Sequence, residues 1–243
     1  MQNWFVSWFN SPYYHILYKD RDISEAEAFV DKLSDYVTVP TGSRALDLAC
    51  GKGRHSVRLW KNGYEVIGID LSKDSIAEAK LNEKEGLDFF EHDMRELYWN
   101  DYFDVVVNLF TSFGYFHNKE DDQKTITSVA DSLKNSGLFV IDFMNAVKVI
   151  ENLVDYEEKT VDGVKFEITR SVEEDVIVKR IHVIDGEVEL DFEEQVDALK
   201  KVDFQDYLNQ AGMTITSTFG DYQLNLFEEK TSDRLIIIAK KQS

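Results

Sequence analysis

Two different spacings of apolar residues divide this chain into two kinds of predicted structure. Up to about residue 149, short apolar runs alternate with stretches that have the three-to-four-residue spacing of amphipathic helices. Strands separated by helical stretches are typical of βαβ units and of a mostly parallel sheet. The predicted strands in this part are 44–49, 65–70, 87–91, 103–109 and 137–142. The predicted helices are 24–36, 54–62, 73–84 and 119–134.

Capping signals set several of these helix boundaries. Ser24 is followed three residues later by Glu27, which is the capping-box pattern. Ser72 is placed to cap the helix that starts at residue 73. The Ser136-Gly137 pair is expected to end the helix before the fifth strand.

The spacing changes between residues 155 and 196, where a period of two replaces the helical one. The alternating runs surround Asp162-Gly163 and Asp185-Gly186, and Asp-Gly between such runs is a strong hairpin signal. The residues that we expect to share one side of their strands are Val164, Phe166 and Ile168, and then Val188, Leu190 and Phe192. This part therefore predicts an antiparallel meander. A helix 203–211 and strands 213–219 and 234–240 follow it.

The strongest candidate chemistry lies between the first strand and its helix, in the run Asp47-Leu48-Ala49-Cys50-Gly51-Lys52-Gly53. Its glycines let the backbone approach a ligand and adopt angles closed to other residues. The next strand ends in Asp70, where a carboxylate can accept hydrogen bonds from both ribose hydroxyls. Together these features predict a site for an adenosine-containing cofactor.

The residues around the turn narrow the choice of cofactor. A dinucleotide site would have a third glycine where this chain has Ser56, and no Gly-Lys-Ser/Thr follows the turn as in a phosphate-binding P-loop. Asp47 before the turn favours a cationic ligand. S-adenosylmethionine offers a ribose to Asp70 and carries an ammonium and a sulfonium instead of phosphate. A nucleotide-dependent oxidoreductase, or a cofactor-binding domain without turnover, remains the alternative.

These residues resemble the class I S-adenosylmethionine-dependent methyltransferases. Asp47-x-Ala-Cys-Gly-x-Gly is followed by Asp70 23 positions after Asp47, and the resemblance covers about 24–145 and 200–240. It implies an α/β fold with a doubly wound, mostly parallel seven-stranded sheet. It also implies a cofactor domain made of 1–148 and 199–243, with 149–198 inserted as an antiparallel substrate cover or dimer surface.

The resemblance further implies which residues hold the cofactor. Asp93 would accept the adenine amino group, the Met94 amide would face the adenine ring, and Asn108 would lie beside the methionine part and the methyl group. Residues 1–23 are rich in aromatics, among them Phe5, and resemble the mobile segment that covers the cofactor in small-molecule members. Packing in the core or in a dimer is the alternative. The full cofactor set is Tyr14, Asp47, Ala49, Gly51, Gly53, Arg54, Asp70, Leu71, Asp93, Met94 and Asn108.

Catalytic residues are harder to predict, because methyl transfer needs mainly alignment of the nucleophile and exclusion of water. The loop 111–117 does not match the Asn/Asp-Pro-Pro-Tyr/Phe pattern of methyltransferases that act on bases, which favours a small-molecule acceptor. His117 could be a general base or could cap the helix 119–134. Asp142, at the end of the fifth strand, is a comparable candidate, and Tyr115 could orient a substrate or simply pack.

Composition restricts partners and location. Lysine and arginine number 27 against 46 aspartates and glutamates, and the resulting charge of −19 repels phosphate backbones, so we expect no nucleic-acid substrate. A single cysteine, Cys50, fits a reducing compartment, and the five histidines are too scattered to predict a metal site. With no leader and no long apolar stretch, we expect a cytoplasmic enzyme without a membrane partner, a monomer or homodimer. The acceptor itself is not predicted.

Overall fold

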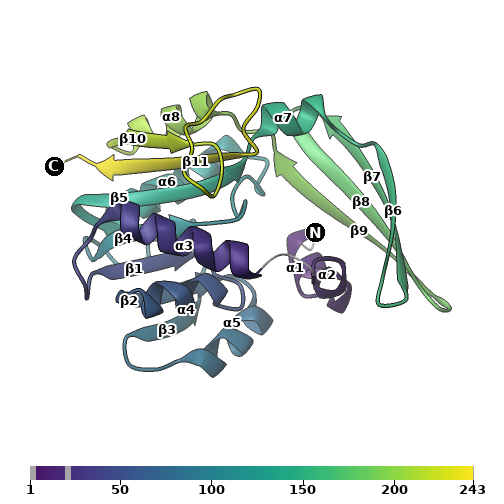
Figure 1. The fold of residues 1–243 in the computed structure, drawn as a ribbon, viewed down its shortest axis with the longest axis horizontal. Helices are drawn as coiled ribbons and strands as arrows, with labels where there is room; N and C mark the ends of the chain where they lie inside the picture. The colour runs from purple at the N-terminus through teal and green to yellow at the C-terminus, as the bar shows by residue number, and fades with distance from the viewer. Residues whose placement is uncertain (1–3, 20–22, 243) are drawn as a thin grey trace.

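The structure is a computed structural model that describes residues 4–19 and 23–242. Among these residues, the larger sheet has seven strands in the order β10-β11-β5-β4-β1-β2-β3 (Figure 1). Its central strands pair in parallel, whereas β11 runs antiparallel to both β5 and β10. The strand bounds are β1 Arg44–Leu48, β2 Glu65–Asp70, β3 Leu87–Glu91, β4 Phe103–Asn108, β5 Leu133–Met144, β10 Met213–Phe219 and β11 Arg234–Lys241.

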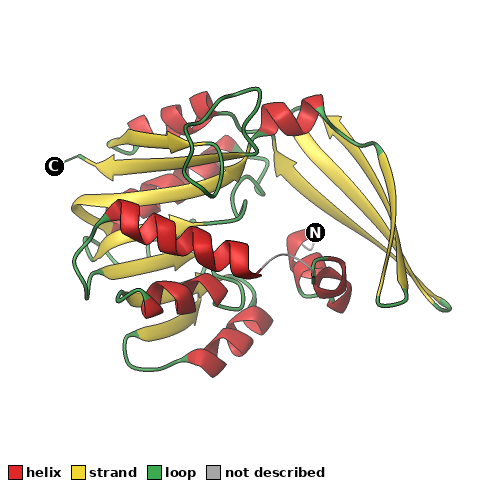
Figure 2. Ribbon diagram, in the orientation of Figure 1, coloured by secondary structure: helices red, strands yellow, loops and turns green. Residues whose placement is uncertain are grey.

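Helices cover both faces of this sheet (Figure 2). On one face, apolar residues of α3 Ile23–Val37, α4 Arg54–Lys61 and α5 Lys73–Ala79 form a core with the sheet; a short 3₁₀ turn, η1 Lys80–Asn82, follows α5. On the other face, α6 Lys119–Ser132 and α8 Lys201–Gln210 contribute to a second core. Alternate strand residues face opposite cores, as in a doubly wound α/β fold. The predicted fold class is therefore confirmed.

A second sheet, in the order β6-β7-β8-β9, lies between β5 and α8 in the chain. Its antiparallel strands are β6 Tyr156–Val161, β7 Val164–Glu173, β8 Val176–Asp185 and β9 Val188–Asp197, and α7 Ala146–Glu151 leads into it. Asp162 and Gly163 both have positive φ, as a two-residue hairpin turn requires. The predicted antiparallel meander is confirmed, while its role as a substrate cover or dimer surface stays a prediction.

The N-terminal segment, residues 4–19, lies between the two sheets (Figure 1). It contains α1 Trp4–Phe9 and α2 Pro12–Leu17. Trp8 and Leu17 are buried against a face of the second sheet that includes Phe166 and Ile181. Residues 1–3 and 20–22 of the predicted 1–23 segment, and the side chains of Phe5 and Ser24, lie outside the described residues, so the predicted capping box is not described.

Three local predictions have different outcomes. Ser72 caps α5 as predicted, because its hydroxyl accepts a hydrogen bond from the Ser75 amide at 3.2 Å. The prediction that Ser136-Gly137 ends the preceding helix is wrong: α6 ends at Ser132, and β5 starts at the buried Leu133. The third prediction, that Val188, Leu190 and Phe192 share one side of their strand, agrees with the register of β9, but the three residues differ in burial.

Val188 and Leu190 lie at the turn end of β9. Val188 is 47% exposed and Leu190 41% exposed. Phe192, further along the same side of the strand, contacts the rings of Trp8 and Tyr13. Val188 and Leu190 lie outside the apolar cluster formed with the N-terminal segment, so alternation alone did not predict their exposure.

Candidate cofactor and acceptor site

The glycine turn and Asp70 meet at the carboxyl ends of β1 and β2. Gly51 and Gly53 have φ of 55° and 80°, in the left-handed region that favours glycine, and α4 starts directly after Gly53. The Gly51 amide donates to Asp70 Oδ2 at 2.8 Å, and the Ser72 amide donates to Asp70 Oδ1 at 2.7 Å. Burial raises the pKa of Asp70, and these amides oppose that rise. Each oxygen keeps a further lone pair, so the fixed carboxylate can accept two hydroxyl groups.

Close packing beneath the turn explains one of its glycines. A Cβ on Gly53 would lie 2.5 Å from Phe89 Cε1, so that position has no room for a side chain. At Gly51 an added Cβ would meet nothing within 4 Å, which leaves open space beside the backbone. Cys50 is buried there, and burial raises the pKa of its thiol, as expected for a packing residue.

Ser56 has a specific role at the place where a dinucleotide site would have its third glycine. Its hydroxyl donates to Asp47 Oδ2 at 2.5 Å, and both residues are buried. Burial raises the pKa of Asp47 to about 6, although the hydrogen bond from Ser56 lowers it, and the nearby charge of Asp70 raises it further. A cation beside this acid would offset the cost of burying its charge.

Asn108 ends β4 beside the turn. Its side-chain amide donates to the Leu48 carbonyl at 2.9 Å, which ties β4 to the end of β1. Its Oδ1 is buried without a hydrogen-bond partner among the residues that the structure describes. A buried acceptor of this kind is costly unless a donor reaches it. S-adenosylmethionine, the cofactor that the sequence implies, has an ammonium group that can donate a hydrogen bond to this oxygen. Asn108 therefore fits that cofactor.

The next four predicted cofactor residues differ in their contacts, exposure and backbone conformation. Asp93 accepts from the Arg95 guanidinium at 2.6 Å, and although burial raises its pKa, these hydrogen bonds keep that pKa below its ordinary value. Met94 packs against the core, and Leu71 is 41% exposed. Ala49 has a left-handed φ of 61°, which is uncommon for a residue other than glycine.

Arg54 and Tyr14, both predicted cofactor residues, belong to different elements, α4 and α2. Arg54 Nη2 lies 3.1 Å from His55 Nε2, and its guanidinium lies over the Phe110 ring. Burial lowers the pKa of His55 to about 3, so this histidine is neutral at pH 7. Tyr14 belongs to α2 and makes edge-to-face contacts with Trp8 and Phe9.

The three catalytic candidates have distinct environments. His117 Nδ1 lies 2.6 Å from Asp197 Oδ1, at the end of β9. The prediction that His117 caps α6 is wrong, because Asn118 is the cap and its side chain accepts from the Glu120 amide at 2.9 Å. The Tyr115 hydroxyl donates to the Thr111 carbonyl.

Asp142, the third candidate, is fully buried and surrounded by donors. Its Oδ1 accepts from Arg234 Nε at 2.7 Å, and its Oδ2 accepts from the Phe110 amide at 2.9 Å and the Tyr222 hydroxyl at 3.3 Å. An acid with these contacts is suited to holding the backbone in place. Its predicted role as a base has no support in this geometry.

The N-terminal segment, residues 4–19, connects the loops after β2 and β4 of the large sheet to the second sheet. Ser72, next to the Asp70 site, donates to Asn10 Oδ1 at 2.6 Å. The rings of Trp4 and Phe9 contact the Tyr115 ring, and their centroids lie 5.4 and 5.8 Å, respectively, from the Tyr115 centroid. The segment therefore contacts the ends of two different strands of the large sheet.

On its other side, the segment is held by one acid of β9. Trp8 Nε1 and the Tyr18 hydroxyl both donate to Glu194 Oε1, at 2.6 and 2.7 Å. Lys179 Nζ lies 3.4 Å from Glu194 Oε2 and also donates to the Tyr18 hydroxyl. Arg180 and His182 pair with acids on the opposite, charged side of the sheet.

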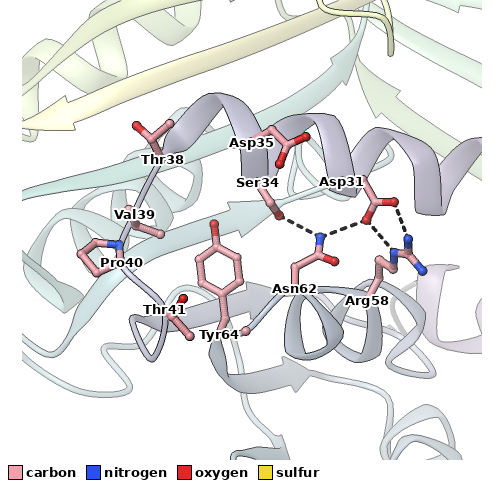
Figure 3. Close-up of a pocket in the computed structure, with 11 residues that line it drawn as sticks. Asp31, Ser34, Asp35, Thr38, Val39, Pro40, Thr41, Arg58, Asn62 and Tyr64 are labelled. Carbon is pink, nitrogen blue, oxygen red and sulfur yellow. Dashed lines mark hydrogen bonds and ion pairs between the residues drawn. The ribbon is translucent and has the colours of Figure 1, made fainter.

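A surface pocket lies elsewhere, beside the residues that follow α3 and α4 (Figure 3). It has a volume of about 550 Å³ and is lined by the ends of α3 and α4. Its polar groups already pair with each other: Arg58 binds Asp31, and Asn62 Nδ2 donates to Asp31 Oδ1 at 3.0 Å and to Ser34 Oγ at 3.1 Å. These polar groups are therefore already paired within the protein, and the cofactor site stays predicted at the carboxyl ends of β1 and β2.

Within residues 4–19 and 23–242, no group of three or more histidines, cysteines, aspartates or glutamates is placed to hold a metal ion. In the same ranges no helix is long and apolar enough to cross a membrane.

Comparisons with known proteins agree with this geometry. The family model described as a methyltransferase domain matches residues 45–137. A solved S-adenosylmethionine-dependent methyltransferase from Clostridium acetobutylicum ATCC 824 has a TM-score of 0.80 and 24% identity, over 95% of this chain and 96% of the other. Residues 45–137 therefore match a methyltransferase domain, and the chain shares the fold of this S-adenosylmethionine-dependent methyltransferase, so the predicted resemblance is confirmed.

Two curated relatives add detail. YqeM of Bacillus subtilis (strain 168), whose name places it among methyltransferases, is 39% identical over 117 residues. That match spans 47% of this chain and only 47% of the relative. The glycine/sarcosine N-methyltransferase of Aphanothece halophytica is 27% identical over 231 residues, which are 91% of this chain and 83% of the relative.

Proposed function

We propose that this chain transfers a methyl group from S-adenosylmethionine to an amino group of a small molecule. The observation that carries the proposal is the Asp70 carboxylate, fixed by the amides of Gly51 and Ser72 at the end of β2. Two such fixed oxygens suit the two hydroxyls of a ribose. The methyltransferase domain matched over residues 45–137 includes all three of these residues.

The remaining cofactor contacts follow from charge. Asp47 and the unpartnered Asn108 Oδ1 would receive the ammonium of the methionine part, while Gly51 leaves space for its backbone to approach. Asp93 and Met94 would bind the adenine. Asp93 would then share its oxygens between Arg95 and the adenine amino group. When bound, the cofactor supplies a methyl group on a positively charged sulfur.

The acceptor would lie between the loop after β4 and the N-terminal segment. Trp4 and Phe9 meet Tyr115 there, and such an aromatic enclosure excludes water from the transferred methyl group. Aromatic faces also attract a sulfonium by about 0.5–2 kcal/mol. In this proposal residues 4–19 cover the site, and the second sheet supports that cover through Glu194.

An amine is the proposed acceptor for two reasons. A neutral amine has its own lone pair for the methyl carbon, so the chain needs to align it about 3 Å away and provide no strong base. The relative from Aphanothece halophytica, which aligns with 91% of this chain, is named as an N-methyltransferase of glycine and sarcosine. The alternative function, a nucleotide-dependent oxidoreductase, is not favoured, because the matched domain is a methyltransferase domain.

A labelled-methyl assay tests this proposal. Purified protein is incubated with S-adenosylmethionine carrying a labelled methyl group and with glycine, sarcosine and other small primary and secondary amines. We expect label on the nitrogen of at least one amine, with kcat/KM reduced tenfold or more in Asp70→Ala. Cofactor binding with transfer only to oxygen or sulfur acceptors would contradict the amine assignment, and absence of cofactor binding would contradict the proposal as a whole.

A further inference from the structure

The loop after β4 leaves the strand in an unfavourable backbone conformation. Phe110 and Thr111 have φ of 60° each, in the left-handed region. Residues other than glycine rarely adopt it, and a β-branched residue such as Thr111 does so least of all. Two consecutive residues of this kind persist only where surrounding contacts hold them.

Asp142 contacts the backbone of both strained residues. The Phe110 amide donates to Asp142 Oδ2, and the Thr111 amide donates to the Asp142 carbonyl, each at 2.9 Å. Asp142 is fully buried, so water does not compete for these hydrogen bonds.

Arg234, at the start of β11, completes the arrangement. Its Nε donates to Asp142 Oδ1 at 2.7 Å, and its Nη2 donates to Thr111 Oγ1 at 2.9 Å. The guanidinium therefore neutralises the buried acid and at the same time holds the Thr111 side chain. Tyr222 donates to Asp142 Oδ2 at 3.3 Å.

The backbone of Thr111 is linked to the proposed acceptor site by a hydrogen bond. The Thr111 carbonyl accepts the hydrogen bond from the Tyr115 hydroxyl, and the Tyr115 ring contacts Trp4 and Phe9 of the N-terminal segment. A change in the Thr111 backbone would therefore move Tyr115.

We infer that Asp142 and Arg234 are a positioning pair that holds Phe110 and Thr111 in their strained conformation and so places Tyr115 against the acceptor. The assignment of an acceptor to this loop rests on the proposed function. Asp142 acts through the loop backbone in this account and not as a general base, since its two oxygens already accept from Arg234, Phe110 and Tyr222.

Hydrogen exchange with mass spectrometry tests the pair without any need for an acceptor. We expect Asp142→Asn to speed amide exchange in residues 109–116 at least tenfold, with S-adenosylhomocysteine affinity changed less than threefold. Arg234→Lys, which keeps the charge and loses the fork of donors, should give a smaller increase. Asp122→Asn, which also removes a buried carboxylate, is the matched control and should leave this loop unchanged.

Turnover separates positioning from base catalysis. With an amine that accepts the labelled methyl group, Asp142→Asn should lower kcat at least tenfold and keep the wild-type shape of the pH profile. Loss of the acidic limb of that profile, or wild-type exchange in residues 109–116 of both variants, would overturn the inference. If Asp142→Asn does not fold, Arg234→Lys decides by the same measurements. Failure of the unaltered protein to bind S-adenosylhomocysteine would overturn the proposed function, and the exchange result would still decide the inference.

Discussion

Individual acids show how burial and ligand binding are linked in this molecule. Asp47 is 1% exposed, and burial raises its pKa to about 6. The native protein therefore binds more protons at Asp47 than the unfolded chain does between about pH 4 and 6. Its contribution to the free energy of unfolding falls as pH rises through that window. A bound cation beside the carboxylate would reverse this loss.

We accordingly predict opposite effects of Asp47→Asn on stability and on binding. At pH 7.5 the variant should unfold at a higher temperature without ligand, because a buried charge worth about 3 kcal/mol of destabilisation is gone. S-adenosylmethionine should bind at least tenfold more weakly by calorimetry. Asp122 is equally buried and its pKa is raised to about 7 by burial, so Asp122→Asn should raise stability without changing binding. Equal binding by both variants would count against a cofactor role for Asp47.

Substitutions of the two glycines of the turn should also have different effects, one on stability and the other on cofactor binding. Gly53→Ala places a methyl group 2.5 Å from Phe89 Cε1 at a φ of 80°, so we expect a loss of about 1–3 kcal/mol in unfolding free energy. Gly51→Ala has open space around its Cβ, and its larger effect should be on cofactor affinity. Denaturant unfolding and calorimetry on both variants check this, and a more stable Gly53→Ala variant would contradict the packing account.

Among the elements, the N-terminal helices α1 and α2 depend on contacts from β9. Glu194→Ala removes the acceptor for Trp8 and Tyr18, so amide exchange in residues 4–19 should accelerate and S-adenosylhomocysteine should dissociate at least threefold faster. Glu193→Ala, adjacent on β9 and paired with Arg180 on the other side of the sheet, is the control. If both variants behave alike in stopped-flow dissociation and exchange, the segment does not cover the cofactor.

Sequence patterns predicted the elements better than their contacts. The strands around the glycine turn and the Asp70 site were predictable, because apolar runs, glycines and a terminal acid are local signals. Arg234, Asp197 and Glu194 were missed as site residues, since their partners lie far away in the chain: Asp142 and Arg234 are 92 positions apart. The boundary of β5 was misplaced because Leu133 is held by pairing with Phe103, which no local pattern records.

In the whole protein, the aromatic segment 4–19 lies between the two sheets and packs on the second one (Figure 1). In the proposed function the large sheet binds the cofactor and this segment covers it. A ligand that binds only the folded protein stabilises it by about 2.7 kcal/mol at a concentration of 100 times its Kd. S-adenosylhomocysteine at that concentration should therefore raise Tm by about 5–10 °C. NADH should leave Tm unchanged, and a rise with NADH alone would favour the oxidoreductase.

Isothermal titration calorimetry of S-adenosylmethionine with the wild-type chain and with Asp70→Ala tests directly whether Asp70 binds the cofactor. We expect one binding site per chain and an affinity at least tenfold lower in the variant, because the ribose loses the carboxylate that Gly51 and Ser72 hold in place. Equal affinity in the two proteins, or no binding by the wild-type chain, would contradict this expectation.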